Sequence, residues 1–174
     1  VGCDLYETSD QSRGLTIYNN TFVGCGVGSN GFKNLEIFNN LFYKPAGNRA
    51  ISTSRPGSGE GFIPSILYSD YNIFYPEASF GLDLNLSDLK YNSLQEWRTV
   101  TSSFEGGFET SSTTIPPDMN SLTDDPMVVS ESSLDYRVSM SSIAHVNQQK
   151  GRDKEGIGCY PTGEEVIGLI PNEE

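Results

Sequence analysis

The chain has 174 residues, which is enough for one domain with a hydrophobic core but short for two domains. Its formal net charge of −12 disfavours binding to a nucleic-acid backbone or to an anionic membrane surface, whereas neutral sugars, cations and basic partners remain open as ligands. The 18 Gly and 9 Pro favour many turns and an all-β fold, and no run reaches the ~18 apolar residues needed for membrane insertion.

One eight-residue phrase occurs three times in the first part of the chain. It reads LTIYNNTF at residues 15–22, LEIFNNLF at residues 35–42 and LYSDYNIF at residues 67–74. A second short phrase, Val-Gly-Cys, stands at residues 1–3 and again at residues 23–25, directly after the first copy of the longer phrase. We therefore expect the chain to begin at the boundary of a repeat unit, as a piece of something longer.

Apolar residues alternate within each phrase, and their phase shifts at the double asparagine. An alternation of period two predicts a strand with one face inward, and the phase shift predicts a bend. A unit of ~20 residues cannot bury its own apolar face and must stack on its neighbours, which is the principle of a solenoid. With stacked units about 4.8 Å apart, Asn20, Asn40 and Asn72 are expected to form a hydrogen-bonded ladder at the bend.

The third unit carries an insertion at residues 44–62, KPAGNRAISTSRPGSGEGF. It concentrates Lys44, Arg49 and Arg55 in an otherwise acidic chain, and insertions of this kind leave the repeat as loops. The three cations are therefore candidate substrate-binding residues for an anionic sugar chain. The alternative is a solvated loop whose cations bind no ligand, which its many Gly, Ser and Pro residues favour.

A short helix is expected in the second half of the chain. Asn92 is the predicted N-cap with Gln95 at the third helical position, and Leu94, Trp97 and Val100 follow at helical spacing. Trp97 is expected to cover the open end of the stack.

Further along the chain, the apolar runs at residues 127–129 and 136–140 are predicted to continue as edge strands or final rungs. Asp125 is expected to cap a turn before Pro126, and His145, the single histidine, to have a structural role.

The NNxF phrases resemble the rungs of right-handed parallel β-helices of the pectate-lyase-like superfamily. The segments DYNIFYP, SLQEW, SLTDDPMVV, LDYRVSMSSIA and GIGCYP are similar, in this order, to the closing segment of many secreted β-helix proteins. The resemblance covers about residues 15–161, although residues 141–144 lack the usual proline. It implies an all-β right-handed parallel β-helix, a solenoid of about three coils at residues 1–74, followed in the same domain by a C-terminal capping segment with a short helix at residues 75–174.

The resemblance also implies a function. The chain would be the C-terminal part of an extracytoplasmic, secreted or cell-surface carbohydrate-active protein that acts on or binds an acidic polysaccharide, with the catalytic coils of a lyase or hydrolase mainly upstream. The alternative is a non-catalytic structural or glycan-binding module of a surface, filament or phage protein. The closing segment occurs in proteins of both classes and does not decide between them. A second chain, or self-association, is expected to cover the open N-terminal coil.

Arg13 and Lys33 are the weak catalytic candidates that the resemblance implies, because lyases of this family use a Lys or Arg on neighbouring coils to remove a proton beside a uronate carboxylate. No lyase motif surrounds either residue, and solvated charges at strand edges are the alternative. No cofactor is evident. Calcium is left as a candidate, although neither the acidic residues near the N-terminus (Asp4, Glu7 and Asp10) nor Asp124-Asp125 form a calcium motif, so no metal site is predicted.

Cys3, Cys25 and Cys159 match no metal-binding pattern and leave at least one thiol unpaired. Cys3 and Cys25 stand one repeat unit apart, within reach of a disulfide by their Cα spacing. Side chains on adjacent parallel strands rarely meet the dihedral requirement, so buried thiols are favoured over a disulfide.

Overall fold

The computed structural model describes residues 3–6, 15–30, 35–45, 47, 49–54, 66–84, 87–99, 117–159 and 162. At residues 3–6, 29–30, 53–54, 66–67, 82–84 and 87–89 it describes the backbone alone. This part of the chain consists mainly of short strands with a few helical turns. In the same part of the chain, no helix is long and apolar enough to cross a membrane.

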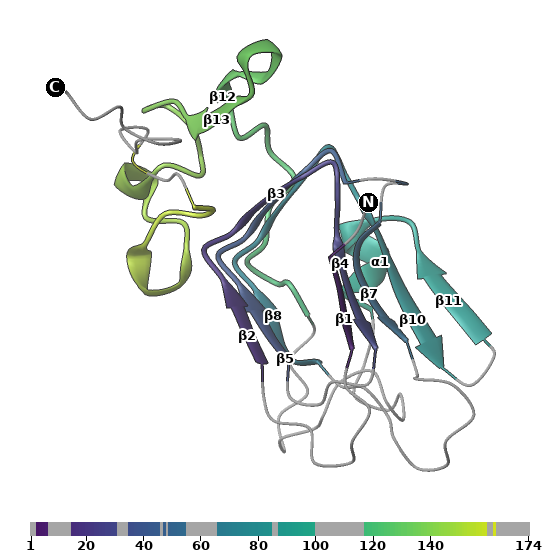
Figure 1. Ribbon diagram of the computed structural model, residues 1–174. Coiled ribbons are helices and arrows are strands. Elements are labelled where there is room, and N and C mark those ends of the chain that lie inside the picture. The colour runs from purple at the N-terminus through teal and green to yellow at the C-terminus, as the bar shows by residue number, and fades with distance from the viewer. Residues whose placement is uncertain are drawn as a thin grey trace, which may run out of the picture.

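Most strands belong to three sheets in which neighbouring strands come from successive repeat units (Figure 1). Sheet A has the order β1 (Cys3–Tyr6), β4 (Val27–Asn30), β7 (Arg49–Ser54), β10 (Ser79–Leu84) and β11 (Ser87–Tyr91). Sheet B has the order β2 (Leu15–Tyr18), β5 (Leu35–Phe38) and β8 (Ile66–Asp70), and sheet C has β3 (Thr21–Val23), β6 (Leu41–Tyr43) and β9 (Ile73–Tyr75).

The repeated phrase sets the register of sheets B and C. Leu15 lies opposite Leu35 in a parallel pair, and Phe22, Phe42 and Phe74 lie opposite one another in sheet C. The three phenylalanine rings stack with centroids 4.9 and 5.2 Å apart, which places the largest side chain of each unit in one continuous column. The core thus begins with the side chains that alternate inward along the phrase.

The bend between sheets B and C falls at the residue before each ladder position. Asn19, Asn39 and Tyr71 have φ angles of 54°, 55° and 56°, in the left-handed region. Asparagine tolerates this conformation better than most residues, because its short polar side chain forms local hydrogen bonds. The first asparagine makes the corner in the first two units and Tyr71 makes it in the third, and the ladder asparagine follows directly.

The structure corrects the predicted fold class. We expected one right-handed parallel β-helix of about three coils closed by a tail, whereas the strands of the described residues form four small, separate sheets, of which one is mixed and one is antiparallel. The chain reverses after β10, so that β11 pairs with it in the antiparallel sense and ends sheet A. The 20-residue spacing dictated parallel pairing between repeat units, but it carried no information about how the sheets end.

The short helix α1 (Leu94–Trp97) begins one residue later than predicted. Ser93, not Asn92, is the N-cap, and its hydroxyl oxygen accepts a hydrogen bond from the Glu96 amide at 3.1 Å. The Glu96 carboxylate in turn accepts from the backbone amide of Asn92, the residue before the N-cap, at 2.6 Å, which is a variant of the capping box. The helix buries Trp97 against Phe80, with ring centroids 4.9 Å apart.

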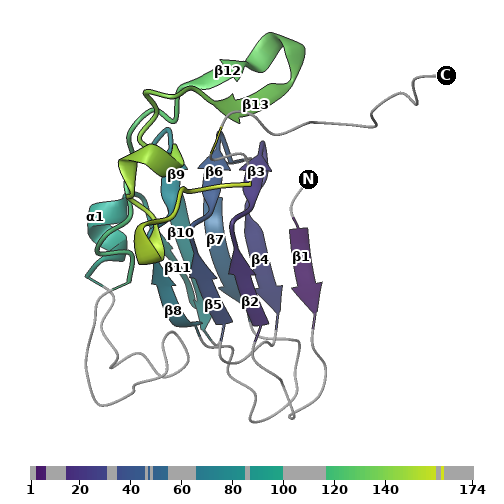
Figure 2. The ribbon, with the colours of Figure 1, turned by 90° about the vertical axis from the view of Figure 1, so that its left-hand side faces the viewer.

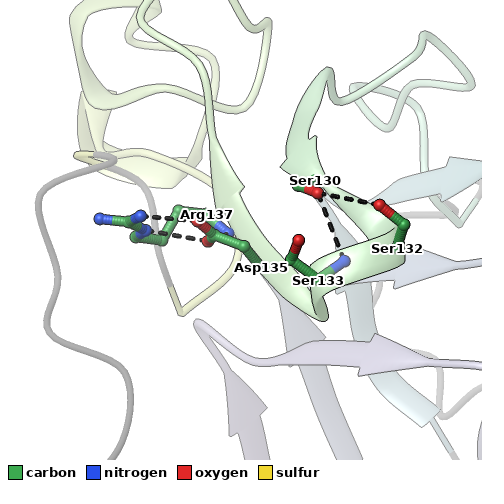
Figure 3. A network of polar contacts seen from close by, with 5 residues as sticks. All are labelled: Ser130, Ser132, Ser133, Asp135 and Arg137. Carbon is green, nitrogen blue, oxygen red and sulfur yellow. Dashed lines mark hydrogen bonds and ion pairs between the residues drawn. The ribbon is translucent and has the colours of Figure 1, made fainter.

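The two apolar runs of the tail pair with each other. Strands β12 (Val128–Ser130) and β13 (Asp135–Val138) form an antiparallel hairpin through the 3-10 turn η2 (Glu131–Ser133). Of the two predicted alternatives, both runs are therefore edge strands of a separate two-stranded sheet and not final rungs of the parallel stack. Figure 3 shows the polar contacts that hold the hairpin turn: the Ser130 hydroxyl oxygen accepts from the Ser133 amide, and Arg137 pairs with Asp135. These local bonds compete with the ladder that a final rung would need.

The last described segment returns to the corner between sheets B and C (Figure 2). It contains the 3-10 turns η3 (Val146–Gln148) and η4 (Arg152–Lys154), and the Gly158 amide donates to the Asn39 carbonyl at 2.8 Å. Ile157 packs in a second core cluster with Leu41 and Ala144. The buried His145 ring nitrogens bond to the Asn147 amide and the Thr162 carbonyl, which holds this segment in place.

Candidate functional site

The structure places Asn20, Asn40 and Asn72 in a continuous ladder. The Asn20 side-chain amide donates to Asn40 Oδ1 at 3.2 Å, and the Asn40 amide donates to Asn72 Oδ1 at 3.1 Å. Asn40 Nδ2 also donates to the carbonyl oxygens of Ile17 and Phe38, at 2.9 Å each. Asn40 therefore satisfies backbone groups of its own repeat unit and of the neighbouring one, and Asn72 Nδ2 donates to the Ile37 carbonyl of the neighbouring unit at 3.0 Å, which is a structural role.

Asp118 continues the ladder from the second half of the chain. It is fully buried, and its carboxylate accepts hydrogen bonds from the side chains of Ser69, Asn72, Trp97 and Ser121 at 2.7, 3.0, 2.8 and 2.7 Å. Burial raises the pKa of the Asp118 carboxyl, and these four donors oppose that rise. The group joins α1, sheet B and the loop before β12 at one point.

The predicted basic loop does not gather its cations at one site among the described residues. Lys44 Nζ forms an ion pair with Glu131 Oε2 at 2.5 Å, and its ammonium group lies 5.2 Å from the Tyr43 ring centroid. The ion pair lowers the pKa of Glu131 and raises the pKa of Lys44. Lys44 therefore attaches the β12–β13 hairpin to sheet C.

Arg49 is the first residue of β7, in sheet A, and its guanidinium covers Gly81. Lys44 and Arg49 thus contact different sheets. Arg13, Lys33 and Arg55, the other predicted catalytic or substrate-binding residues, lie outside the described residues.

The described part of the chain contains neither a metal-binding cluster nor a paired cysteine. No group of three or more metal-ligating side chains occurs there, and Asp125 accepts a hydrogen bond from the Met127 amide at 2.8 Å, as a turn cap does. Cys25 and Cys159 are free cysteines, and Cys3 lies opposite Val27 in the sheet, not opposite Cys25.

An aromatic row on the outer face of sheet B is the arrangement that most resembles a binding surface. The row consists of Tyr18, Phe38 and Tyr68, one from each strand of the sheet. The Tyr18 and Phe38 rings stack with centroids 5.4 Å apart, and Phe38 meets Tyr68 edge to face at 6.1 Å. Inward residues of the same strands, such as Ile37, are fully buried, so strand alternation turns these rings outward.

Arg152 completes the row from the C-terminal segment. Its guanidinium carbon lies 4.6 Å from the Phe38 ring centroid and 5.3 Å from that of Tyr68. The Arg152 backbone amide donates to Asn39 Oδ1 at 2.6 Å, so the corner asparagine positions this cation. A cation over aromatic rings gains electrostatic energy from the ring quadrupoles.

The two ends of the aromatic row differ in exposure. Tyr18, in β2, is 54% exposed, whereas Phe38 and Tyr68 are only partly exposed beneath Arg152. Glu36 lies opposite Tyr68 in sheet B, and Glu155 accepts from the side-chain amide of Asn39 at 3.5 Å. The result is an open ring at one end, a guanidinium at the other, and hydrogen-bonding groups along the side.

Tyr68 gives the row a spectroscopic marker. Burial raises the pKa of Tyr68 to about 12, the nearby Asp70 carboxylate adds to the rise, and Arg152 opposes it. We expect one part of the alkaline tyrosinate absorbance titration to occur near pH 12 and to be missing in Tyr68→Phe. Because the folded pKa lies above the unfolded value of about 10, the stability that neutral Tyr68 contributes is complete below pH 10 and is lost as the pH rises through 12. An unchanged titration in Tyr68→Phe would contradict this environment.

The sequence contained a signal for the row that the motif analysis missed. Tyr18 and Phe38 occupy the same place in the repeated phrase, directly before the double asparagine and out of phase with the inward leucine and isoleucine. An aromatic residue repeated on the outward phase indicates an exposed stack. Tyr68 is shifted by a register irregularity, and Arg152 is contributed by a segment distant in sequence, so neither was visible in the repeat.

Comparison of the chain with family models, curated proteins and solved structures finds no match.

Proposed function

We propose that this protein binds a carbohydrate chain through the aromatic row, as a secreted or cell-surface protein. The observation that supports this most directly is the exposed Tyr18 ring at the end of a stack that Arg152 holds at its other end. A sugar ring has one face of C–H groups and a rim of hydroxyl groups. An aromatic face is complementary to the C–H face because its quadrupole attracts polarised hydrogens, and adjacent polar groups serve the rim.

The charges around the row favour a carbohydrate over other polymers. Glu36 and Glu155 flank the rings, and the whole chain carries a formal net charge of −12. A phosphate backbone is repelled by such a surface, whereas neutral sugar hydroxyls can donate hydrogen bonds to its carboxylates. We limit the proposed activity to binding, because Arg13 and Lys33, the candidate catalytic residues, lie outside the described residues.

Affinity electrophoresis through gels containing neutral and uronate polysaccharides tests the proposal. The protein is expected to be retarded by at least one neutral polysaccharide, and Tyr18→Ala to weaken this binding about tenfold by removing the ring face. Met140→Ala serves as the matched control, because Met140 is 73% exposed and is not part of the row. Circular dichroism verifies that both variants remain folded.

Two results would refute carbohydrate binding at the row. One is the absence of retardation in every gel of the panel. The other is a Tyr18→Ala variant that is folded and retarded as strongly as the unsubstituted protein.

A further inference from the structure

A groove separate from the aromatic row lies beside α1. It is an open groove of about 580 Å³ between α1, the loop before β12 and the segment before η4, and its lining includes Tyr71, Leu94, Arg98, Asn120, Asp124 and Lys150. This volume lies within the range of small-molecule sites in proteins. None of the aromatic-row residues lines the groove, so the two surfaces are distinct.

The scaffold holds Arg98 in a fixed orientation at the groove. Its Nε donates to the Asp118 carbonyl at 2.8 Å and its Nη2 donates to the Ser121 carbonyl at 2.7 Å. These bonds use two of the five N–H groups of the guanidinium, on one side of the fork. Among the described residues, no hydrogen bond or ion pair involves Nη1. The end of the fork, formed by Nη1 and the second hydrogen of Nη2, has the geometry that a carboxylate accepts in two parallel bonds.

The charged side chains that line the groove are mainly basic, and the Asp70 carboxylate lies behind the lining residue Asn120. Arg98 and the exposed Lys150 contribute two positive charges, against one negative charge from Asp124 at the rim, in a chain of net charge −12. No ion pair to Lys150 occurs within the described residues. Two cations that converge from different segments on one groove attract an anion, and a rim carboxylate penalises a ligand with more than one negative charge.

The remaining lining favours hydroxyl groups. Asn120 donates its backbone amide and its side-chain amide to the two oxygens of Asp70, at 2.7 Å each. This fixes the Asn120 side chain and leaves Oδ1 as an acceptor. Thr123 and Gln149 also line the groove, while Leu94 and Leu122 contribute apolar surface.

We propose that this groove binds a small hydroxylated monocarboxylate of the sugar-acid class. The carboxylate lies on the end of the Arg98 fork and near Lys150, and the hydroxyl groups donate to Asn120 and neighbouring side chains. A phosphate dianion is less suitable, because its additional negative charge is repelled by the Asp124 carboxylate. The site does not depend on carbohydrate binding at the aromatic row.

Calorimetric titration with D-glucuronate, D-glucose and inorganic phosphate tests the site at low ionic strength. Glucuronate is expected to bind saturably, and Lys150→Glu to weaken the binding about tenfold or more, because the change replaces attraction by repulsion. Asp124→Asn is expected to strengthen the binding several-fold, since the rim carboxylate opposes the anion. Substitutions at two positions of the groove thus shift affinity in opposite directions.

The matched control for Lys150→Glu is Lys154→Glu, because Lys154 is exposed, carries the same charge in the same segment and does not line the groove. Lys154→Glu and Tyr18→Ala are expected to leave glucuronate binding unchanged, which separates this site from the aromatic row. Fluorescence of Trp97, the single tryptophan, reports whether each variant is folded. Absence of glucuronate binding, equal binding of glucose or phosphate, or equal losses in the two lysine variants would overturn the assignment.

Discussion

Replacing Asp118 by alanine is expected to lower the free energy of unfolding by about 4 kcal/mol or more, one of the two largest effects of a single change in the described structure. The substitution leaves the hydroxyl groups of Ser69 and Ser121, the Asn72 amide and the Trp97 indole N–H without their acceptor in a buried site. Each unsatisfied buried donor costs about 1 to 3 kcal/mol. Alanine is also strained at this position, where φ is 54°.

The backbone and side-chain contributions of Asp118 can be separated. Asparagine at position 118 tolerates the left-handed backbone and preserves the shape of the side chain. It replaces one of the two carboxylate oxygens, which accepts two hydrogen bonds, by an NH2 group that only donates. We expect it to cost about 2 to 3 kcal/mol, less than alanine, because the serine hydroxyls can reorient toward the amide while the indole N–H cannot. Urea unfolding, followed by circular dichroism and by the fluorescence of Trp97, measures both variants.

The control for Asp118 is Asp124→Ala, which removes an exposed carboxylate in the same loop. It is expected to change the stability by less than about 0.5 kcal/mol. A stability loss in Asp118→Ala no larger than that of the control would show that the four hydrogen bonds do not hold the second half of the chain against sheet B.

Replacing Asn40 by alanine is expected to cost about 3 kcal/mol, because it breaks the middle of the asparagine ladder. Asn40 is fully buried, and its loss leaves the carbonyl oxygens of Ile17 and Phe38 and the amide of Asn20 without partners. Asn40→Asp distinguishes the two functions of the side chain, because a carboxylate still accepts from Asn20 but donates nothing to the two carbonyls. It is therefore expected to be destabilising as well.

Asn20→Ala is the matched control for the ladder, since Asn20 has the same place in its repeat unit but is exposed. Water can replace its hydrogen bonds, so we expect a loss of about 1 kcal/mol or less in the same urea experiment. Equal losses at Asn20 and Asn40 would mean that burial does not determine the contribution of a ladder position.

The candidate sites show which contacts the local sequence could predict and which it could not. The basic loop was predicted to bind substrate because cations are rare in this chain. Lys44 instead forms an ion pair with Glu131 of the β12–β13 hairpin. The aromatic row and the groove depend on Arg152, Arg98 and Lys150, which come from segments distant in sequence from the repeats they meet. A sequence repeat predicts contacts between its own units. It does not predict contacts with segments outside the repeat.

The capping of α1 shows the same limit on a smaller scale. Both Asn92 and Ser93 are good N-cap residues, and local preference did not decide between them. The burial of Trp97 against Phe80 and its hydrogen bond to Asp118 fix the orientation of the helix, and in this orientation the Ser93 hydroxyl oxygen accepts from the Glu96 amide.

The sequence by itself determined the parallel pairing of the repeated phrases, the inward leucine, isoleucine and phenylalanine columns, and the asparagine positions, because a period of two within a strand and a fixed repeat length leave few other ways to bury these side chains. The tertiary structure alone decided that the strands of the described part of the chain divide into four sheets, that β11 and the hairpin pair in the antiparallel sense, and that Asp118 ends the ladder. These features depend on where the chain reverses and on which distant donors bond to a buried carboxylate. Such long-range interactions cannot be predicted from a local sequence pattern.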